Sequence, residues 1–419
     1  MAPDNGDDYQ ASGPFEGPEK LLEIWFAPSA ASVPGIPDAD GRIGLRRIDR
    51  KVWEDMLDIV KCKVLSTMDG LEMDAYLLSE SSFFIFPHKL ILKTCGTTLN
   101  LLGVPRILEI AAQYADLPTV YRCFYSRKSF MFPELQKGPH RDWKHEVEFL
   151  DGIFHEGAAY TIGKVNGDHW LLYVVCSSDT TPSPHSSNNT LPSDPEHIPD
   201  YTIEILMSGL AKGPRDAFHF GEQPSTDSPS MLASERSLEL GINNIFPSHL
   251  TSLDPYAFAP CGYSSNALIR LGDTARSDAL TSRPREGYYT IHVTPEEGWS
   301  YASFECNVPL APSHNKGADI KVMPDIETLV QRVVSIFQPD RITLTLFISS
   351  KDNKDDPTSH VEDAQRAFRS ALATKKGTVK HNKIYRRTDK INYEFGDYDL
   401  AFASFELDGS ILDGNHDCH

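Results

Sequence analysis

The sequence has no apolar run long enough to cross a bilayer. Its first 13 residues are acidic and polar, and they lack the basic start and apolar centre of a secretory leader. Basic residues are also scarce: 40 Lys and Arg stand against 59 Asp and Glu, for a net charge of −19. Because a nucleic-acid-binding surface needs a basic patch, the composition argues against nucleic acid as a partner. We expect no membrane association either.

Paired cysteines are absent as well. The seven cysteines are scattered without a CxxC motif, at positions 62, 95, 123, 176, 261, 306 and 418. An odd, dispersed set is typical of free thiols in a reducing compartment, so we expect a cytoplasmic protein. There is no HExxH motif, and the terminal His416-Asp417-Cys418-His419 cluster is too short to predict a metal site.

What the chain does have is a pattern of elements that occurs twice. Each half shows strand, strand, helix and strand, followed by a further helix. The expected elements lie at 75–86, 89–96, 104–116, 118–126 and 141–153, and then at 287–294, 300–307, 324–338, 341–349 and 361–373. This order predicts an α+β fold with antiparallel sheets and outer helices, in duplicated halves at about 15–176 and 200–407. The pattern alone is compatible with two domains or with one merged unit.

Turn and loop signals separate these elements. Val165-Asn166-Gly167-Asp168 predicts a hairpin between strands at 158–164 and 169–175. Two polar, aperiodic segments, 177–199 and 268–286, are predicted to be flexible inserts.

One apolar run is interrupted by polar residues. Leu78-Ser79-Glu80-Ser81-Ser82 lies inside the predicted strand 75–86, and Lys93-Thr94-Cys95-Gly96-Thr97-Thr98 follows twelve residues later. Polar residues in the middle of a strand conflict with strand propensity, which indicates either an exposed face or a functional site.

A second motif, Phe15-Glu16-Gly17-Pro18-Glu19-Lys20-Leu21-Leu22-Glu23-Ile24-Trp25-Phe26, predicts a short helix with Pro near its start. Its apolar stripe would hold the Leu, Trp and Phe residues. Glu16, Glu19 and Glu23 would lie on another face, which is compatible with a solvated acidic face or with a site.

Together with Pro260-Cys261-Gly262-Tyr263-Ser264 and Ile291-His292-Val293-Thr294-Pro295-Glu296, these motifs resemble, in the same order, the eukaryotic (fungal-type) S-adenosylmethionine decarboxylase proenzymes. The resemblance covers the chain from Phe15 to about Leu407. It implies a four-layer α/β/β/α sandwich of two antiparallel sheets, formed as a single domain over 1–419. It also implies self-cleavage into a β chain, 1–80, and an α chain, 81–419, paired as an (αβ)2 dimer.

The resemblance implies a role for each residue near the cut. The Ser81 hydroxyl attacks the Glu80 carbonyl, Ser264 stabilises the oxyanion, and His292 removes the Ser81 α-proton. Ser81 thereby becomes a covalent pyruvoyl cofactor (pyruvate), which forms a Schiff base with the substrate amine. Cys95 then returns a proton to the substrate after CO2 has left.

Substrate-binding residues are implied in the same way. Phe15 and Phe258 sandwich the adenine of S-adenosylmethionine, and Glu296 binds the ribose hydroxyls. Glu16 and Glu19 belong to the active site, where carboxylates and aromatic faces suit a sulfonium cation.

A further set of residues resembles the family's site for the activating diamine putrescine. It comprises Glu23, Lys93, Asp200, Glu204 and Glu305. Buried carboxylates need a partner cation, which putrescine would supply. The alternative is a structural lysine–glutamate network without a ligand.

Two other functions remain open from the sequence. One is an inactive regulatory paralogue that binds and activates a decarboxylase partner; such a protein has no need to keep Ser81, Cys95, Ser264 and His292 together. The other is a pyruvoyl decarboxylase for ornithine or arginine, whose substrates offer no adenine or ribose for Phe15, Phe258 and Glu296.

Overall fold

The computed structural model describes residues 14–176, 200–221, 228–271, 286–312, 320–349, 359–373, 384–395 and 398–408. The predicted insert 177–199, most of the insert 268–286, and Cys418 lie outside these residues.

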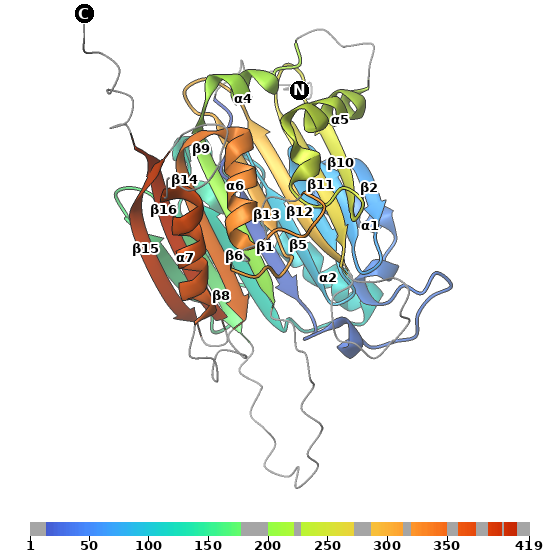
Figure 1. The fold of residues 1–419 in the computed structure, drawn as a ribbon. Helices are drawn as coiled ribbons and strands as arrows, with labels where there is room; N and C mark the ends of the chain where they lie inside the picture. Colours follow the sequence, from blue (N-terminus) through green and yellow to red (C-terminus); the bar gives the residue numbers. More distant parts are fainter. Residues whose placement is uncertain are drawn as a thin grey trace, which may run out of the picture.

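Two antiparallel sheets of eight strands form the centre of the described chain (Figure 1). The first has the order β2-β3-β4-β5-β1-β6-β8-β7 and the second β10-β11-β12-β13-β9-β14-β16-β15. The strands of the first sheet are β1 Lys20–Trp25, β2 Val64–Asp69, β3 Asp74–Leu78, β4 Ser81–Ile85, β5 Lys89–Thr94, β6 Arg122–Lys128, β7 Ala158–Gly163 and β8 His169–Cys176. Those of the second are β9 Tyr201–Leu210, β10 Thr251–Ala257, β11 Tyr263–Arg270, β12 Glu286–Thr294, β13 Tyr301–Cys306, β14 Pro339–Ser349, β15 Tyr385–Phe395 and β16 Tyr398–Leu407.

The second sheet repeats the strand order of the first, with every strand number raised by eight. The duplicated-half prediction is therefore confirmed. Because each half closes its own sheet, the two sheets pack as separate layers and not as interleaved strands.

Helices cover the outer face of each sheet. Those on the first sheet are α1 Arg50–Ile59, α2 Val104–Ala115 and α3 Trp143–Asp151; those on the second are α4 Lys212–Ala217, α5 Pro229–Leu240, α6 Ile326–Phe337 and α7 His360–Ala373. One large apolar cluster joins each sheet to its own helices, and two smaller clusters lie between the sheets. The predicted four-layer α/β/β/α sandwich is confirmed.

The N-terminal motif is a strand and not the predicted helix. β1 pairs with β5 on one side and β6 on the other, so it lies inside the first sheet. Leu22 and Ile24 pack toward the helices, whereas Trp25 packs between the sheets. Since both faces are buried, apolar residues occupy consecutive positions, and this spacing imitates a helical stripe.

The predicted strand 75–86 is two strands joined by a tight turn. Leu78 pairs with Ser81 across the turn, and Glu80 has a left-handed φ of 58°. Thus Ser79 and Glu80 lie at a hairpin tip and not in mid-strand. Two other boundaries were also wrong: β6 begins at Arg122 and not at 118, and 268–270 belongs to β11 while Glu286 begins β12. The hairpin predicted at 165–168 joins β7 and β8.

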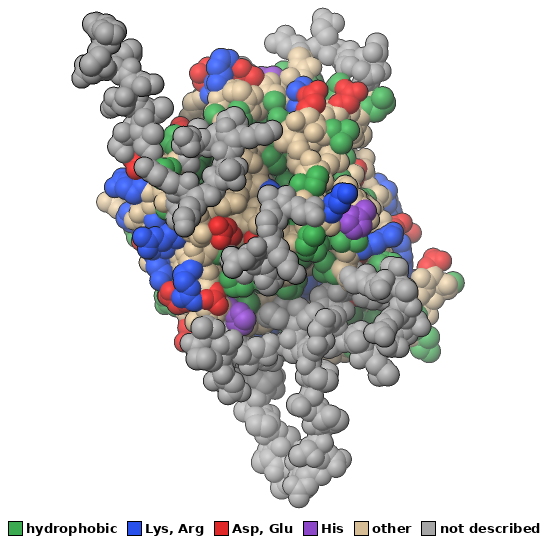
Figure 2. Space-filling view, viewed as in Figure 1, with side chains coloured by type: hydrophobic (Ala, Val, Ile, Leu, Met, Phe, Trp, Pro, Cys, Tyr) green, Lys and Arg blue, Asp and Glu red, His purple; other side chains and the backbone are tan. Residues whose placement is uncertain are grey.

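The face shown in Figure 2 carries acidic and basic side chains intermixed on its described part. Exposed ion pairs of the described chain include Lys390 of β15 with Glu362 of α7 at 2.8 Å, and Arg386 of β15 with Glu406 of β16 at 3.7 Å. Among the described residues, no helix is both long and apolar enough to span a membrane.

Candidate active site

The turn between β3 and β4 borders a small pocket between the two sheets. Side chains from both halves of the chain line it: Phe15, Gly17, Glu80, Cys95, Tyr263, Ser264, His292, Val293, Thr294 and Tyr301. The pocket therefore brings together four residues predicted to act in self-cleavage or catalysis, although they are up to 212 positions apart in the sequence.

The Cys95 thiol donates a hydrogen bond to the backbone carbonyl oxygen of Glu80. This oxygen belongs to the Glu80–Ser81 peptide bond, so negative charge would develop on it if Ser81 attacked. Burial raises the pKa of the Cys95 thiol well above its usual value, and the nearby Glu80 and Glu19 raise it further. Cys95 is thus held as a protonated thiol, which is the form that can donate.

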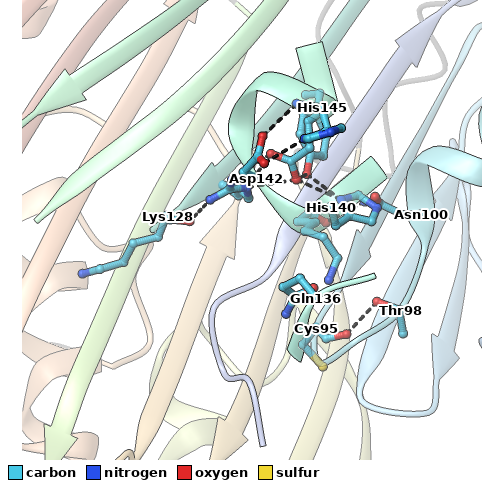
Figure 3. Close-up of polar contacts among 12 residues, drawn as sticks. Cys95, Thr98, Asn100, Lys128, Gln136, His140, Asp142 and His145 are labelled. Carbon is cyan, nitrogen blue, oxygen red and sulfur yellow. Dashed lines mark hydrogen bonds and ion pairs between the residues drawn. The ribbon is translucent and has the colours of Figure 1, made fainter. Parts of the chain in front are cut away.

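Polar contacts fix the loop that carries Cys95 (Figure 3). Thr98 donates to the Cys95 carbonyl at 2.6 Å, and the Gly96 amide donates to the Glu16 carbonyl at 2.9 Å. Lys20 and Gln136 both donate to the Gly96 carbonyl, at 2.9 and 3.3 Å. The thiol is therefore positioned by four backbone contacts.

Lys20 is a site residue that the sequence reasoning missed. Its side chain is fully buried, and burial lowers its pKa to about 8, although electrostatic interactions with Cys95, Glu146 and Glu16 oppose this shift. The signal was a lysine in an otherwise apolar strand, because such a residue needs buried partners.

Ser264 and His292 are direct neighbours on β11 and β12. The Ser264 hydroxyl lies 2.8 Å from His292 Nδ1. Burial lowers the pKa of His292 to about 3, and the charge of Lys93 acts in the same direction. The imidazole is therefore neutral near pH 7 and can accept a proton.

Ser81 itself is fully buried, and its hydroxyl has no partner with normal hydrogen-bond geometry among the described residues. A buried, unpaired hydroxyl next to a carbonyl held by a donor is suited to attack that carbonyl. Ser82, which was also missed, contacts His292 Nε2 at 2.9 Å from the opposite side.

Of the three residues predicted to bind adenine and ribose, only Phe15 lines this pocket. Phe15 lines the pocket, with its ring against the backbone of Gly96. Phe258 is half-buried and packs on Tyr256, with ring centroids 5.0 Å apart. Glu296 is close enough to Glu80 that, after burial, its charge helps to raise the pKa of Glu80 to about 7.

Glu16 and Glu19 are both buried but do not line this pocket. The Glu16 carboxylate accepts from the backbone amides of Met131 and Phe132, each at 2.8 Å. Glu19 accepts from the Ser303 hydroxyl. In this arrangement Glu16 fixes the chain that precedes Gln136, and Glu19 belongs to the charged cluster around Lys93.

That cluster contains three of the residues predicted for the diamine site. Lys93 pairs with Glu305 at 2.7 Å and with Glu204 at 3.6 Å. Burial raises the pKa of Glu19, and the charge of Lys93 offsets only part of this shift. Burial likewise raises the pKa of Glu204 to about 7. Three buried carboxyl groups thus share one lysine.

The other two predicted residues, Glu23 and Asp200, are held by a lysine that the sequence reasoning missed. Lys89 Nζ lies 2.8 Å from Glu23 and 3.5 Å from Asp200. It also lies 4.0 Å from the centroid of the Trp25 ring. Burial acts to lower the pKa of Lys89, but the charges of Asp200 and Glu23 outweigh it and raise the pKa.

The site is built to supply its own cofactor. The residue that would become the pyruvoyl group, Ser81, begins β4 directly after the turn, and its peptide bond to Glu80 carries the oxygen that Cys95 contacts. Among the described residues, no group of three His, Cys, Asp or Glu side chains is arranged to hold a metal.

The chain is similar to known proteins over most of its length. A family model described as "Adenosylmethionine decarboxylase" matches residues 12–406. The chain belongs to this family. It is 34% identical to the S-adenosylmethionine decarboxylase proenzyme of Xenopus laevis over 394 residues, which cover 93% of this chain and 95% of the relative. It is 33% identical to the proenzyme of Saccharomyces cerevisiae over 419 residues, with 94% and 92% covered.

Among solved structures, the chain is similar to the Trypanosoma brucei AdoMetDC-delta26 monomer, with 20% identity and a TM-score of 0.48 over 78% of this chain and 99% of that one. As a member of the decarboxylase family, the chain is a carboxy-lyase that uses a pyruvoyl group made by autocatalytic cleavage.

Replacing Cys95 tests the contact with the Glu80 carbonyl. We expect Cys95→Ala to slow cleavage of the chain by about 100-fold, because one oxyanion donor is lost. Cys95→Ser keeps a donor and should lose less. Intact mass spectrometry of freshly folded chains would follow the reaction, with Cys123→Ala, which alters a buried thiol elsewhere in the first sheet, as the matched control. Cleavage of Cys95→Ala at the rate of the control would contradict this role.

Proposed function

We propose that this chain is a proenzyme that cuts itself between Glu80 and Ser81 and then decarboxylates S-adenosylmethionine. The product, S-adenosylmethioninamine, is the aminopropyl donor for spermidine and spermine. The observation that carries this proposal is the hydrogen bond from Cys95 to the Glu80 carbonyl, in a pocket that Ser264 and His292 also line.

In the cleavage, the Ser81 hydroxyl attacks the Glu80 carbonyl carbon and the amide becomes an ester. Cys95 already donates to the oxygen on which charge develops. Ser264 lies in the same pocket, and its hydroxyl would have to turn from His292 to add a second donor. Neutral His292 is the proton acceptor for the step that breaks the ester.

In the decarboxylation, the pyruvoyl group supplies an electron sink for the bond that releases CO2. The chain's own residues bind the substrate and return the proton. The protonated Cys95 thiol is the donor. Phe15, in the pocket, and Phe258 are the aromatic faces for adenine, and Glu296 is the acceptor for the ribose hydroxyls.

A regulatory paralogue that only activates a partner would not require this arrangement. Here the thiol, the histidine and the scissile carbonyl are connected in one pocket, which a purely binding role leaves unexplained.

The two fragments, β chain 1–80 and α chain 81–419, would stay together after the cut. β4 is paired with β3 on one side and with β5 on the other. The cut falls at the tip of the β3–β4 hairpin, so it removes no strand from the sheet, and the fragments continue to act as the single domain proposed for 1–419.

For the diamine site, we propose that putrescine neutralises the carboxyl groups left over around Lys93. Glu19, Glu204 and Glu305 share that single lysine, and surplus buried negative charge is costly. Glu23 and Asp200 already have Lys89 as a partner. Lys89 and Lys93 are four positions apart on β5, or about 13 Å. Putrescine would therefore act on the cluster of Lys93 with its three carboxyl groups, and not on the Lys89 pair.

We further propose an (αβ)2 dimer in the cytoplasm. The edge strands β7 and β15 lie against each other at one side of the sandwich. Tyr393 on β15 is 43% exposed and lies against the half-buried Tyr160 of β7, with ring centroids 5.4 Å apart, so aromatic side chains are accessible at an open strand edge. The six cysteines among the described residues are free, as in a reducing compartment.

Intact mass of the purified, denatured protein tests the central proposal. We expect two fragments split after Glu80, with the larger one lighter by one ammonia than a chain that begins with serine. Ser81→Ala should remain a single chain. CO2 release should occur from S-adenosylmethionine and not from ornithine or arginine. A single full-length mass for freshly folded wild-type chain would overturn self-processing and favour the regulatory role.

Putrescine dependence can be read from initial rates with and without the diamine. We expect activation in the wild type and weaker activation in Glu204→Gln and Glu305→Gln, because less negative charge is left to neutralise. Lys89→Met should strengthen the dependence, since it frees Glu23 and Asp200. Equal rates with and without putrescine in all four proteins would favour the ligand-free network.

The oligomer can be measured by light scattering coupled to size-exclusion chromatography. We expect the mass of two αβ units for the wild type and a shift toward one unit for Tyr393→Lys, because a charge on the aromatic edge opposes pairing. Lys51→Glu provides the control, because it changes the charge of an exposed side chain on α1, where Lys51 pairs with Asp55. A wild-type mass of one unit would exclude the dimer.

A further inference from the structure

Ser82 lies one residue after the cleavage site and reaches across to the other sheet. Its side chain is fully buried. Its hydroxyl oxygen lies 2.6 Å from Asn266 Oδ1, 2.8 Å from Thr290 Oγ1 and 2.9 Å from His292 Nε2. Strand alternation explains the direction, since Phe84, two positions later, also faces the second sheet and stacks on Tyr288 at 4.1 Å.

The available protons in this cluster can be counted. The Asn266 oxygen can only accept, so Ser82 donates its single hydroxyl proton to it. Thr290 then donates its own proton, and its nearest acceptor is Ser82 Oγ at 2.8 Å, with the Ser265 carbonyl at 3.1 Å. Neither hydroxyl then has a proton left, and both oxygens act as acceptors toward His292 Nε2, which lies 2.9 Å from Ser82 and 3.1 Å from Thr290.

His292 must therefore carry its proton on Nε2. Because burial keeps the imidazole neutral, Nδ1 has a free lone pair. Nδ1 is the nitrogen that lies 2.8 Å from the Ser264 hydroxyl, on the pocket side. The histidine thus presents an acceptor to the cleavage site and its proton to the opposite sheet.

We propose that Ser82, Asn266 and Thr290 are positioning residues for self-cleavage, which fix the tautomer of His292 so that Nδ1 faces the reacting bond. The inference rests on the proposed function. In the step concerned, His292 takes the Ser81 α-proton, the C–O bond of the ester breaks, and Glu80 leaves as a carboxylate. The electron pair forms the C=C bond of dehydroalanine, which water then converts to pyruvoyl with release of ammonia.

The proposal predicts where cleavage should stop when Ser82 is altered. In Ser82→Ala, the first step can still form the ester, but elimination slows by about 10- to 100-fold, because the histidine is no longer held in one tautomer. The full chain should then accumulate as an ester, which hydroxylamine cuts between residues 80 and 81. Time courses of intact mass, with and without hydroxylamine, measure this.

Two variants serve as controls. Ser82→Thr keeps the hydroxyl and should restore cleavage to near the wild-type rate. Ser265→Ala removes an equally buried hydroxyl that does not contact His292 and keeps the backbone carbonyl near Thr290, so it should leave the rate unchanged. The inference is overturned if Ser82→Ala cleaves as fast as the controls, or if it stalls as a chain that hydroxylamine does not cut. A wild-type chain that never cleaves overturns the proposed function, and this inference with it.

The tautomer can also be observed directly. In the uncleavable Ser81→Ala chain with 15N-labelled histidine, the His292 signals, assigned by comparison with His292→Gln, should show a protonated Nε2 and a bare Nδ1. Adding Ser82→Ala should move most of the population to the tautomer protonated on Nδ1, as a 10- to 100-fold loss of rate requires. A proton on Nδ1 in the first chain would contradict the assignment, whatever the cleavage rates.

Discussion

Face-to-face packing of two sheets is the constraint on which the site depends. Buried polar groups on the inner faces need partners within the sandwich, and several find them on the opposite sheet, since unpaired groups are costly. Ser82 meets Asn266 and His292 in this way, and Lys93 meets Glu305. Because these partners come from separate halves of the chain, neither half can form the site alone.

The same constraint explains why charge is buried beside the site. Lysines and carboxylates occupy inward positions of β1, β5, β9 and β13, and they neutralise one another in part. Lys93 belongs to this network and also acts on His292, whose pKa its charge helps to lower. A change in the charge around Lys93 therefore alters the electrostatic potential at His292, the residue that accepts the proton.

The sequence allowed the four-layer fold and most of the reacting residues to be predicted, because both follow from repeated periodicity and from contiguous motifs. It misled where both faces of a strand are buried: in β1 and the residue after it, the pairs Leu21-Leu22 and Trp25-Phe26 satisfy a helical spacing equally well. Lys89 and Ser82 were missed for another reason. Their partners, Asp200 and His292, are 111 and 210 positions away, and no local pattern indicates such pairs.

Two adjacent serines follow Glu80, and the register of β4 decides what each of them does. Phe83 packs on Trp53 in the helix-facing cluster, with ring centroids 5.4 Å apart, whereas Phe84 stacks on Tyr288 between the sheets. By alternation Ser81 faces the helix layer and Ser82 the second sheet. A slip of one residue would exchange the two serines and expose each ring to the wrong layer. The large rings therefore hold the small hydroxyls in place, so that Ser81 is left unpaired beside the carbonyl while Ser82 is bound to His292.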